Sequence, residues 1–194
     1  MCIRDRADTL LEIAGLLIGL LYLWWEYHAN PRLWIASIVM PSISMWIYFR
    51  NGLYADFAIN IYYFIMAIYG YVVWTRHSAK PDKAALPISH IKMPQLLGCL
   101  LALAALWIAI AYGLTYTNST VIPYDSFTTA MSIVATWMLA RKYIEQWIAW
   151  ILVDIVCVGL YFYKGMYFYG PLYAIYTVVA VFGYLKWRKL MKAA

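Results

Sequence analysis

The residues best suited to chemistry are Trp150 and Asp154, which stand four positions apart in a long apolar segment. At this spacing an indole and a carboxylate share one face of a helix. Apolar residues surround Asp154 for about seven positions before it and about nine after it, which places it near the middle of a membrane span. A charge there costs at least about 2.5–3.5 kcal/mol, so an intramembrane carboxylate is a functional hypothesis by default. We expect a site for a cationic aromatic ligand. The alternative is a carboxylate that holds the bundle together by bonding Tyr or Trp donors of a neighbouring helix.

Further polar and aromatic side chains recur at helical spacing in other apolar segments. Asn60 and Tyr63 form one stripe, with Asp56 nearer the outer end of the same segment. A polar stripe in a lipid-embedded helix faces protein or a water-filled path, and interhelical hydrogen bonding would explain it without a ligand. The remaining candidates for the lining of a substrate pocket are Thr136, Trp137, Tyr173, Tyr176 and Trp46.

The composition identifies an integral membrane protein. Of 194 residues, 65% are hydrophobic and 12% charged, which is more apolar surface than a soluble domain of this length can bury. No phosphate-binding loop, nucleophile elbow or zinc-protease motif occurs, so we predict neither an enzyme nor an ATP-driven pump. The three cysteines and three histidines lack ligand spacing, and we therefore expect no metal and no cofactor.

Seven apolar segments are of roughly the length that a helix needs to cross a bilayer. The first six residues lack an apolar core and a small-residue cleavage site, so we expect the first segment to be retained as a span. Asp125 and Ser126, after Pro123, are expected to cap the fifth helix. The predicted spans are about 9–27, 32–50, 54–75, 94–115, 125–142, 147–163 and 166–187.

The basic residues predict the orientation. With the C-terminus in the cytoplasm, eleven of the fifteen Lys and Arg residues fall on the inner side, and Arg4, Arg6, Arg50 and Lys164 on the outer side. This asymmetry indicates an outer N-terminus and an inner C-terminus. It also accounts for the net charge of +6 without a nucleic-acid partner.

An internal repeat organises the chain. Aligning 34–74 with 147–187, at an offset of 113 without gaps, makes thirteen of 41 positions identical, including Trp34/Trp147 and Trp74/Trp187. The repeat predicts two parallel three-helix repeats, 9–75 and 125–187, joined by a linker helix at 94–115 and related by an axis along the membrane normal. Asp154 aligns with Pro41, which is expected to kink its own helix.

Several motifs together resemble the PnuC family of bacterial vitamin transporters. They are Gly52-Leu-Tyr-Ala-Asp56 leading to Asn60-Ile-Tyr-Tyr63, Asp125-Ser-Phe-Thr-Thr, and Ala140-Arg-Lys-Tyr with Gln146-Trp-Ile-Ala-Trp150. The resemblance implies a 3+1+3 fold similar to SWEET sugar transporters, assembled as a homotrimer in the bacterial inner membrane. It also implies facilitated diffusion with trapping by a cytoplasmic vitamin kinase.

The resemblance leaves the cargo open among nicotinamide riboside, thiamine and riboflavin. Nicotinamide riboside members tend to have a glutamine where this chain has Thr136, followed here by Trp137. Fewer ribose-type hydrogen bonds and more ring stacking favour thiamine, the cargo of the PnuT branch, over nicotinamide riboside. A rival of another class is a substrate-binding membrane subunit that needs a partner for transport.

Overall fold

The computed structural model describes residues 18–50, 54–78, 86–117, 121–165, 167 and 169–193, without the side chains of 54–56, 77, 78 and 169. Residues 1–6 and the first part of the predicted span 9–27 lie outside the described residues. The all-helical class is confirmed, since the described regular structure is helical apart from one isolated bridge. The chain divides into two compact units, Met1–Leu86 and Pro87–Ala194, and the division falls within the polar loop that precedes the predicted linker helix.

The first unit contains a helical stretch at 18–27, then α2 (Leu33–Arg50) packed on α3 (Tyr54–Ser78). The side-chain oxygen of Asn30 accepts a hydrogen bond from the backbone N–H of Arg32 at 3.0 Å, which closes the turn before α2. Pro41 is buried inside α2, and the helix continues through it to Arg50.

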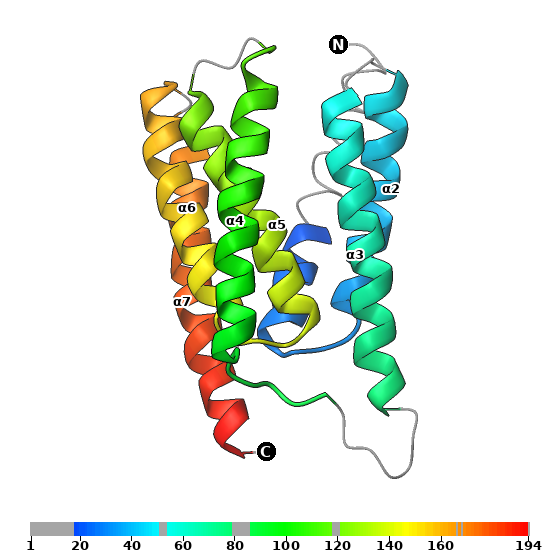
Figure 1. Cartoon of the computed structure of the whole chain (residues 1–194). Helices are drawn as coiled ribbons and strands as arrows, with labels where there is room; N and C mark the ends of the chain where they lie inside the picture. The colour runs from blue at the N-terminus through cyan, green and yellow to red at the C-terminus, as the bar shows by residue number, and fades with distance from the viewer. Residues whose placement is uncertain are drawn as a thin grey trace, which may run out of the picture. The chain divides into compact units, whose positions relative to one another are not determined.

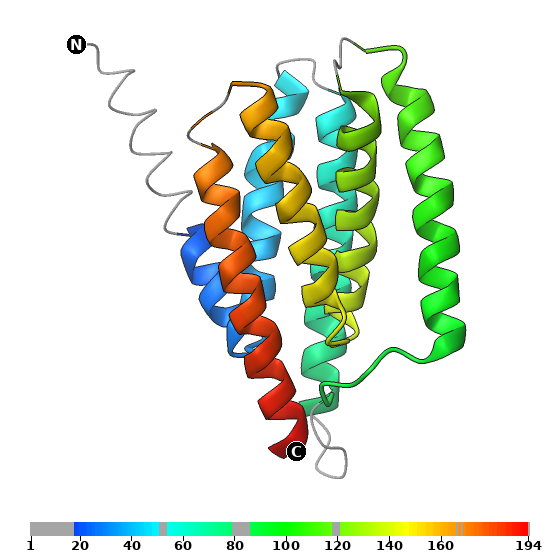
Figure 2. The same ribbon diagram turned by 90° about the vertical axis from the view of Figure 1, so that its left-hand side faces the viewer.

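The second unit is a row of four antiparallel helices, α4 (Met93–Leu114), α5 (Ile122–Ala140), α6 (Gln146–Tyr163) and α7 (Tyr169–Ala193). Each packs on the next along the chain, α4 on α5, α5 on α6 and α6 on α7 (Figures 1 and 2). Short connections make this order the natural one for an antiparallel bundle. The middle helices of the row, α5 and α6, are therefore flanked on both sides.

From residue 32 onward, the predicted spans match α2 to α7 within three residues at each boundary except the end of the last helix. The last helix continues past 187 to Ala193, because its basic final turns remain helical outside the apolar segment. The fifth helix begins earlier than expected, since Val121 is its N-cap and Pro123 lies in its first turn. The predicted cap at Asp125 and Ser126 was wrong, because proline is tolerated where the first helical N–H groups have no partner anyway.

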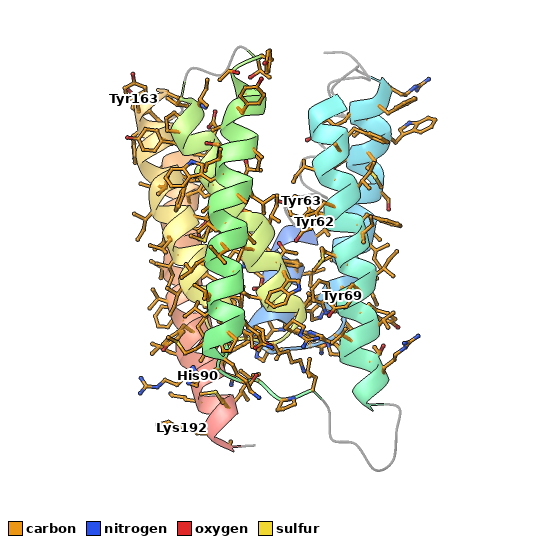
Figure 3. The ribbon with its side chains drawn as sticks, viewed as in Figure 1. Tyr62, Tyr63, Tyr69, His90, Tyr163 and Lys192 are labelled. Carbon is orange, nitrogen blue, oxygen red and sulfur yellow. The ribbon has the colours of Figure 1, made fainter. Side chains whose placement is uncertain are left out.

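Among the described residues, four stretches are long and apolar enough to cross a bilayer: α2, α4, α6 and Phe57–Arg76 of α3. In the second unit, His90 and Lys192 lie at one end and Tyr163 at the other (Figure 3). The α5–α6 turn, whose sequence includes Arg141 and Lys142, lies at the same end of this unit as the end of α7 (Figure 1). The charge asymmetry read from the sequence therefore corresponds to two opposite ends of this unit.

The repeat appears as the same pair of tryptophans in each unit. Trp34 of α2 meets Trp74 of α3 edge to face, with ring centroids 5.6 Å apart and planes at 87°. Trp147 of α6 meets Trp187 of α7 at 5.7 Å and 88°. All four rings are almost completely buried. Aligned residues thus form the same contact in α2–α3 and in α6–α7.

A glycine completes each tryptophan pair. A Cβ added at Gly70 would lie 2.3 Å from Trp34, and one added at Gly183 would lie 2.6 Å from Trp147. Both distances are shorter than real carbon contacts, so each indole occupies the space that a side chain would need. These glycines are required for the close approach of two helices, which is why they recur at the repeat offset.

The segment before α4, residues 89–91, is hydrogen-bonded to the α5–α6 turn, and we call this segment the strap. The backbone of Ser89 donates to the Lys142 carbonyl at 3.1 Å and accepts from the Ile144 N–H at 3.1 Å. The Glu145 carboxylate accepts the Ile91 N–H at 3.0 Å and lies 2.7 Å from the His90 ring nitrogen Nδ1. The segment before α4 is therefore attached to the turn between α5 and α6, although the two are more than fifty positions apart in the chain.

Candidate functional site

Asp154 lies near the middle of α6 and is 6% exposed. Trp150 precedes it by one turn, and Cys157 and Tyr161 follow it at intervals of three and four residues, so all four share one side of the helix. This side continues to Lys164 at one end and Gln146 at the other. Helix α6 therefore has a polar and aromatic stripe along its whole length, with the carboxylate at its centre.

The stripe faces α5 and α7. Met131 and Ala135 of α5 form a buried cluster with Val153 and Cys157 of α6, and Trp150, Tyr161 and Tyr173 pack against it. Small residues on α5 allow its backbone to approach α6 closely. The predicted site residues Trp150 and Tyr173 are thus brought to one cluster from two different helices.

Three tyrosines extend the aromatic surface beside Asp154. Tyr161 stacks on Tyr173, with ring centroids 5.1 Å apart and planes at 26°. Tyr173 meets Tyr176 edge to face at 5.7 Å. The carboxylate of Asp154 lies within electrostatic range of both Tyr173 and Tyr176. Tyr173 and Tyr176, both predicted to line a substrate pocket, therefore lie on α7 within electrostatic range of this carboxylate.

No basic side chain is paired with Asp154 in the part of the chain that the structure describes. The salt bridges of His90 with Glu145 and of Lys164 with Asp125, the latter at 3.3 Å, involve other carboxylates. A buried carboxylate without a cationic partner favours neutralisation or a cationic ligand. A carboxylate between an indole and phenol rings can hold a flat organic cation, because the rings stabilise the positive charge through their faces.

Thr136 and Trp137 make contacts that involve neither Asp154 nor Trp150. Trp137 packs with Cys99 of α4 and with Tyr143, whose ring lies 5.9 Å from its own. The Thr136 hydroxyl donates to the Ser132 carbonyl at 2.7 Å within α5. Trp137 thus belongs to a cluster between α4 and the α5–α6 turn, separate from the cluster that contains Trp150. The role of Trp137 in the lining of a substrate pocket stays a prediction.

The other predicted residues belong to the first unit. Tyr62 and Tyr63 project from one stretch of α3, with ring centroids 5.6 Å apart (Figure 3). Asn60 precedes them on α3 and is half-buried. Trp46 is 64% exposed and its ring lies 5.2 Å from the Arg50 guanidinium, a placement typical of an aromatic residue at the membrane surface. The side chain of Asp56 lies outside the described residues.

Tyr161 and Cys157 were missed by the sequence reasoning. The signal was present, because Tyr161 follows Asp154 by seven residues and therefore lies on the same side of the helix. Tyrosine is so frequent in this chain, with 19 residues, that a single one near a helix end carries little information. Its stacking on Tyr173 distinguishes it from the tyrosines that face outward.

Comparison with known proteins shows the family of this chain. The family model described as nicotinamide mononucleotide transporter matches residues 9–189. The chain belongs to the nicotinamide mononucleotide transporter family. Members of this family with curated functions include the nicotinamide riboside transporter PnuC of Escherichia coli strain K12, which is 28% identical over 91% of this chain and 84% of its own length.

Two further family relatives differ in the vitamin that their names give. The nicotinamide riboside transporter PnuC of Neisseria mucosa is 24% identical over 95% of this chain and 74% of its own length. The riboflavin/roseoflavin transporter RibM of Streptomyces davaonensis is 25% identical over 91% of this chain and 83% of its own length. The family thus carries more than one vitamin, and the chain is a vitamin transporter of the PnuC type, not an enzyme.

The fold is also that of a solved family structure. The crystal structure of the vitamin B3 transporter PnuC superposes with a TM-score of 0.71 and 22% identity, covering 96% of this chain and 84% of that one. The predicted PnuC resemblance is therefore confirmed. The predicted preference for thiamine is not supported, since the relatives named above carry nicotinamide riboside or riboflavin.

Proposed function

We propose that this chain carries nicotinamide riboside across the bacterial cytoplasmic membrane by facilitated diffusion. The proposal is supported by the relatives whose names give that vitamin and by the chemistry of the α6 stripe. Nicotinamide riboside has a positively charged aromatic ring. It therefore offers a cation to the carboxylate of Asp154 and a flat face to Trp150.

The single observation that carries the proposal is the burial of Asp154 without a basic partner among the described residues. An isolated charge in this position is unfavourable, and a bound cation would offset its cost. Riboflavin has no positive charge, so the same carboxylate would be left unpaired beneath it. The electrostatics thus favour a cationic vitamin over the cargo named for the Streptomyces relative.

Thiamine is the second candidate, because it also contains an aromatic cation. Thr136 favours it, since its hydroxyl proton is donated to the Ser132 carbonyl and is not available to a ribose oxygen. Trp137 no longer adds to that case, because its ring packs with Tyr143 and Cys99. Binding titration of the purified protein with both vitamins decides between them, and tighter binding of thiamine would overturn our first choice.

For the transport cycle we propose two parallel three-helix repeats, 9–75 and 125–187, which move relative to each other around the site. The matching tryptophan pairs of α2–α3 and α6–α7 support this repeat. We further propose an outer N-terminus and a cytoplasmic C-terminus, with uptake maintained by a cytoplasmic kinase that phosphorylates the riboside. The homotrimer stays a prediction, which mass measurement of the detergent-extracted protein would test.

Reconstitution tests the proposed function directly. Proteoliposomes that contain only this chain should equilibrate labelled nicotinamide riboside without ATP or an ion gradient. Enclosing a riboside kinase with ATP should then raise the accumulated label above equilibrium. Binding without equilibration would instead identify a substrate-binding subunit that needs a partner protein. The absence of both binding and equilibration would reject the proposal.

A further inference from the structure

Gln146 is the first residue of α6 and is completely buried, with an exposed fraction of 0%. Neither its amide nitrogen Nε2 nor its amide oxygen Oε1 has a hydrogen-bond partner among the described residues. Buried amides are nearly always bonded, because an unsatisfied donor or acceptor is costly away from water. Such an amide in the interior of a transporter requires an explanation.

The position of Gln146 relates it to the α6 stripe. Gln146, Trp150 and Asp154 follow one another at intervals of four residues, so they lie on one side of the helix at successive turns. Neighbouring members are about 6 Å apart along the axis. The indole nitrogen of Trp150 is also buried without a partner in the described part of the chain. Two residues with unpartnered polar groups therefore stand at successive turns before the carboxylate of Asp154.

We propose that Gln146 binds the neutral, hydrogen-bonding end of the cargo, and that its amide pairs with the carboxamide of a nicotinamide-type ring. This inference rests on the proposed function. A glutamine amide and a carboxamide each offer a donor and an acceptor side by side, so they form two hydrogen bonds with each other. The order carboxamide, ring and sugar along the vitamin then corresponds to Gln146, Trp150 and Asp154 along α6.

The assignment separates two tasks within one site. Asp154 interacts with the positive charge, which all pyridinium ribosides share. Gln146 distinguishes ligands that have the carboxamide from those that lack it, because an unpaired buried amide is left behind when the ligand cannot bond it. Gln146 is thus a specificity-determining residue, whereas Asp154 selects for charge.

A ligand and protein cycle tests this role. Affinities of wild type and Gln146→Leu are measured for nicotinamide riboside and for pyridinium riboside, which lacks the carboxamide. Wild type should prefer nicotinamide riboside by about tenfold or more, and the variant should reduce this preference to about onefold to threefold. Gln146→Glu, which keeps the shape and removes the amide donors, provides a second variant if the leucine protein does not fold. The matched control is Trp147→Phe, because it also removes a buried unpartnered N–H, but at a ring packed on Trp187.

The outcomes distinguish the two proposals. A preference that is the same in wild type, Gln146→Leu and Gln146→Glu would overturn the role of Gln146 and leave nicotinamide riboside as cargo. A wild-type protein that binds neither riboside would overturn both. Loss of affinity for the two ligands by the same factor would show that Gln146 acts only on the fold, which also overturns the inference. Loss of the preference in the Trp147→Phe control would overturn it as well.

Discussion

Replacing Asp154 with asparagine tests whether its carboxylate binds the ligand or only stabilises the fold. The change keeps the shape and the acceptor oxygen and removes the charge. A cation about 4–5 Å from the carboxylate gains about 3–4 kcal/mol at an effective dielectric constant of about 20. Part of this is offset by the desolvation of both groups on binding, and hydrogen bonds to charged groups contribute about 1.5–3 kcal/mol net. We expect the dissociation constant for nicotinamide riboside to rise about 10- to 150-fold.

The thermal stability of Asp154→Asn should not fall together with its affinity for the vitamin. A carboxylate at the bilayer centre is unfavourable by at least about 2.5–3.5 kcal/mol, so the asparagine protein should melt at the same temperature or higher. If Asp154 instead holds the bundle together, the variant should melt at a lower temperature. Binding is measured by isothermal titration in detergent, and melting is followed by the fluorescence of the ten tryptophans.

A neutral ligand provides the control for charge. Dihydronicotinamide riboside has the same groups without the positive charge, so its affinity should differ little between wild type and Asp154→Asn. The matched protein control is Asp125→Asn, whose carboxylate pairs with Lys164 and is 28% exposed. Unchanged affinity of Asp154→Asn for the cationic vitamin would refute the reasoning.

Three further changes test the fold around the site. Gly183→Ala adds a Cβ 2.6 Å from Trp147 and should lower the free energy of unfolding by about 1–3 kcal/mol, measured by thermal melting. Glu145→Ala removes the acceptor of the strap and should speed hydrogen exchange at the Ile91 amide by about 10-fold. Burial lowers the pKa of Lys142 from 10.5 to about 8, so the unfolded chain binds more protons between these values, and stability should rise with pH across that window. Lys142→Met should remove this slope, measured by melting from pH 7 to 10.5, and should raise stability by about 1–3 kcal/mol at neutral pH.

Each of these changes has a control. An alanine at Gly159, where an added Cβ meets nothing within 4 Å, should not lower the melting temperature, because alanine is the better helix former. His90→Ala removes only the exposed partner of the Glu145 carboxylate. It should therefore affect hydrogen exchange at the Ile91 amide less than Glu145→Ala does. If stability still rises with pH in Lys142→Met, the pH dependence comes from another group. Equal melting temperatures of the alanine variants at Gly159 and Gly183 would contradict the close packing of Gly183 against Trp147.

Most helix positions were predictable because hydropathy and spacing are local properties. The apolar segment around Asp154 identifies a span, and the four-residue interval to Trp150 places both residues on one side before any neighbour is known. The paired Trp and Gly landmarks of the repeat were likewise visible in the sequence, and the edge-to-face contacts explain why they recur. The start of the fifth helix was predicted wrongly, because Pro123 is equally compatible with the turn before a helix and with its first turn.

Partners across helices were decided only by the tertiary structure. Trp137 and Trp150 are both tryptophans beside polar residues in apolar segments, and nothing local shows that one turns toward Cys99 and the other toward Met131. The stacking of Tyr161 on Tyr173 depends in the same way on how α6 meets α7. Rotation of a helix about its axis is determined by the volumes of side chains on its neighbours, which a single segment does not contain.

The sequence by itself determined that this chain is apolar enough to span a membrane. It also contains paired Trp and Gly residues at a constant offset of 113 and places one carboxylate among apolar residues in α6. It also contained the motifs of the family. Only the tertiary structure decided which side chains surround that carboxylate and left Gln146 buried with an unbonded amide. The physical reason is that burial cost follows from a residue and its own segment, whereas pairing and packing depend on segments that are distant in the chain.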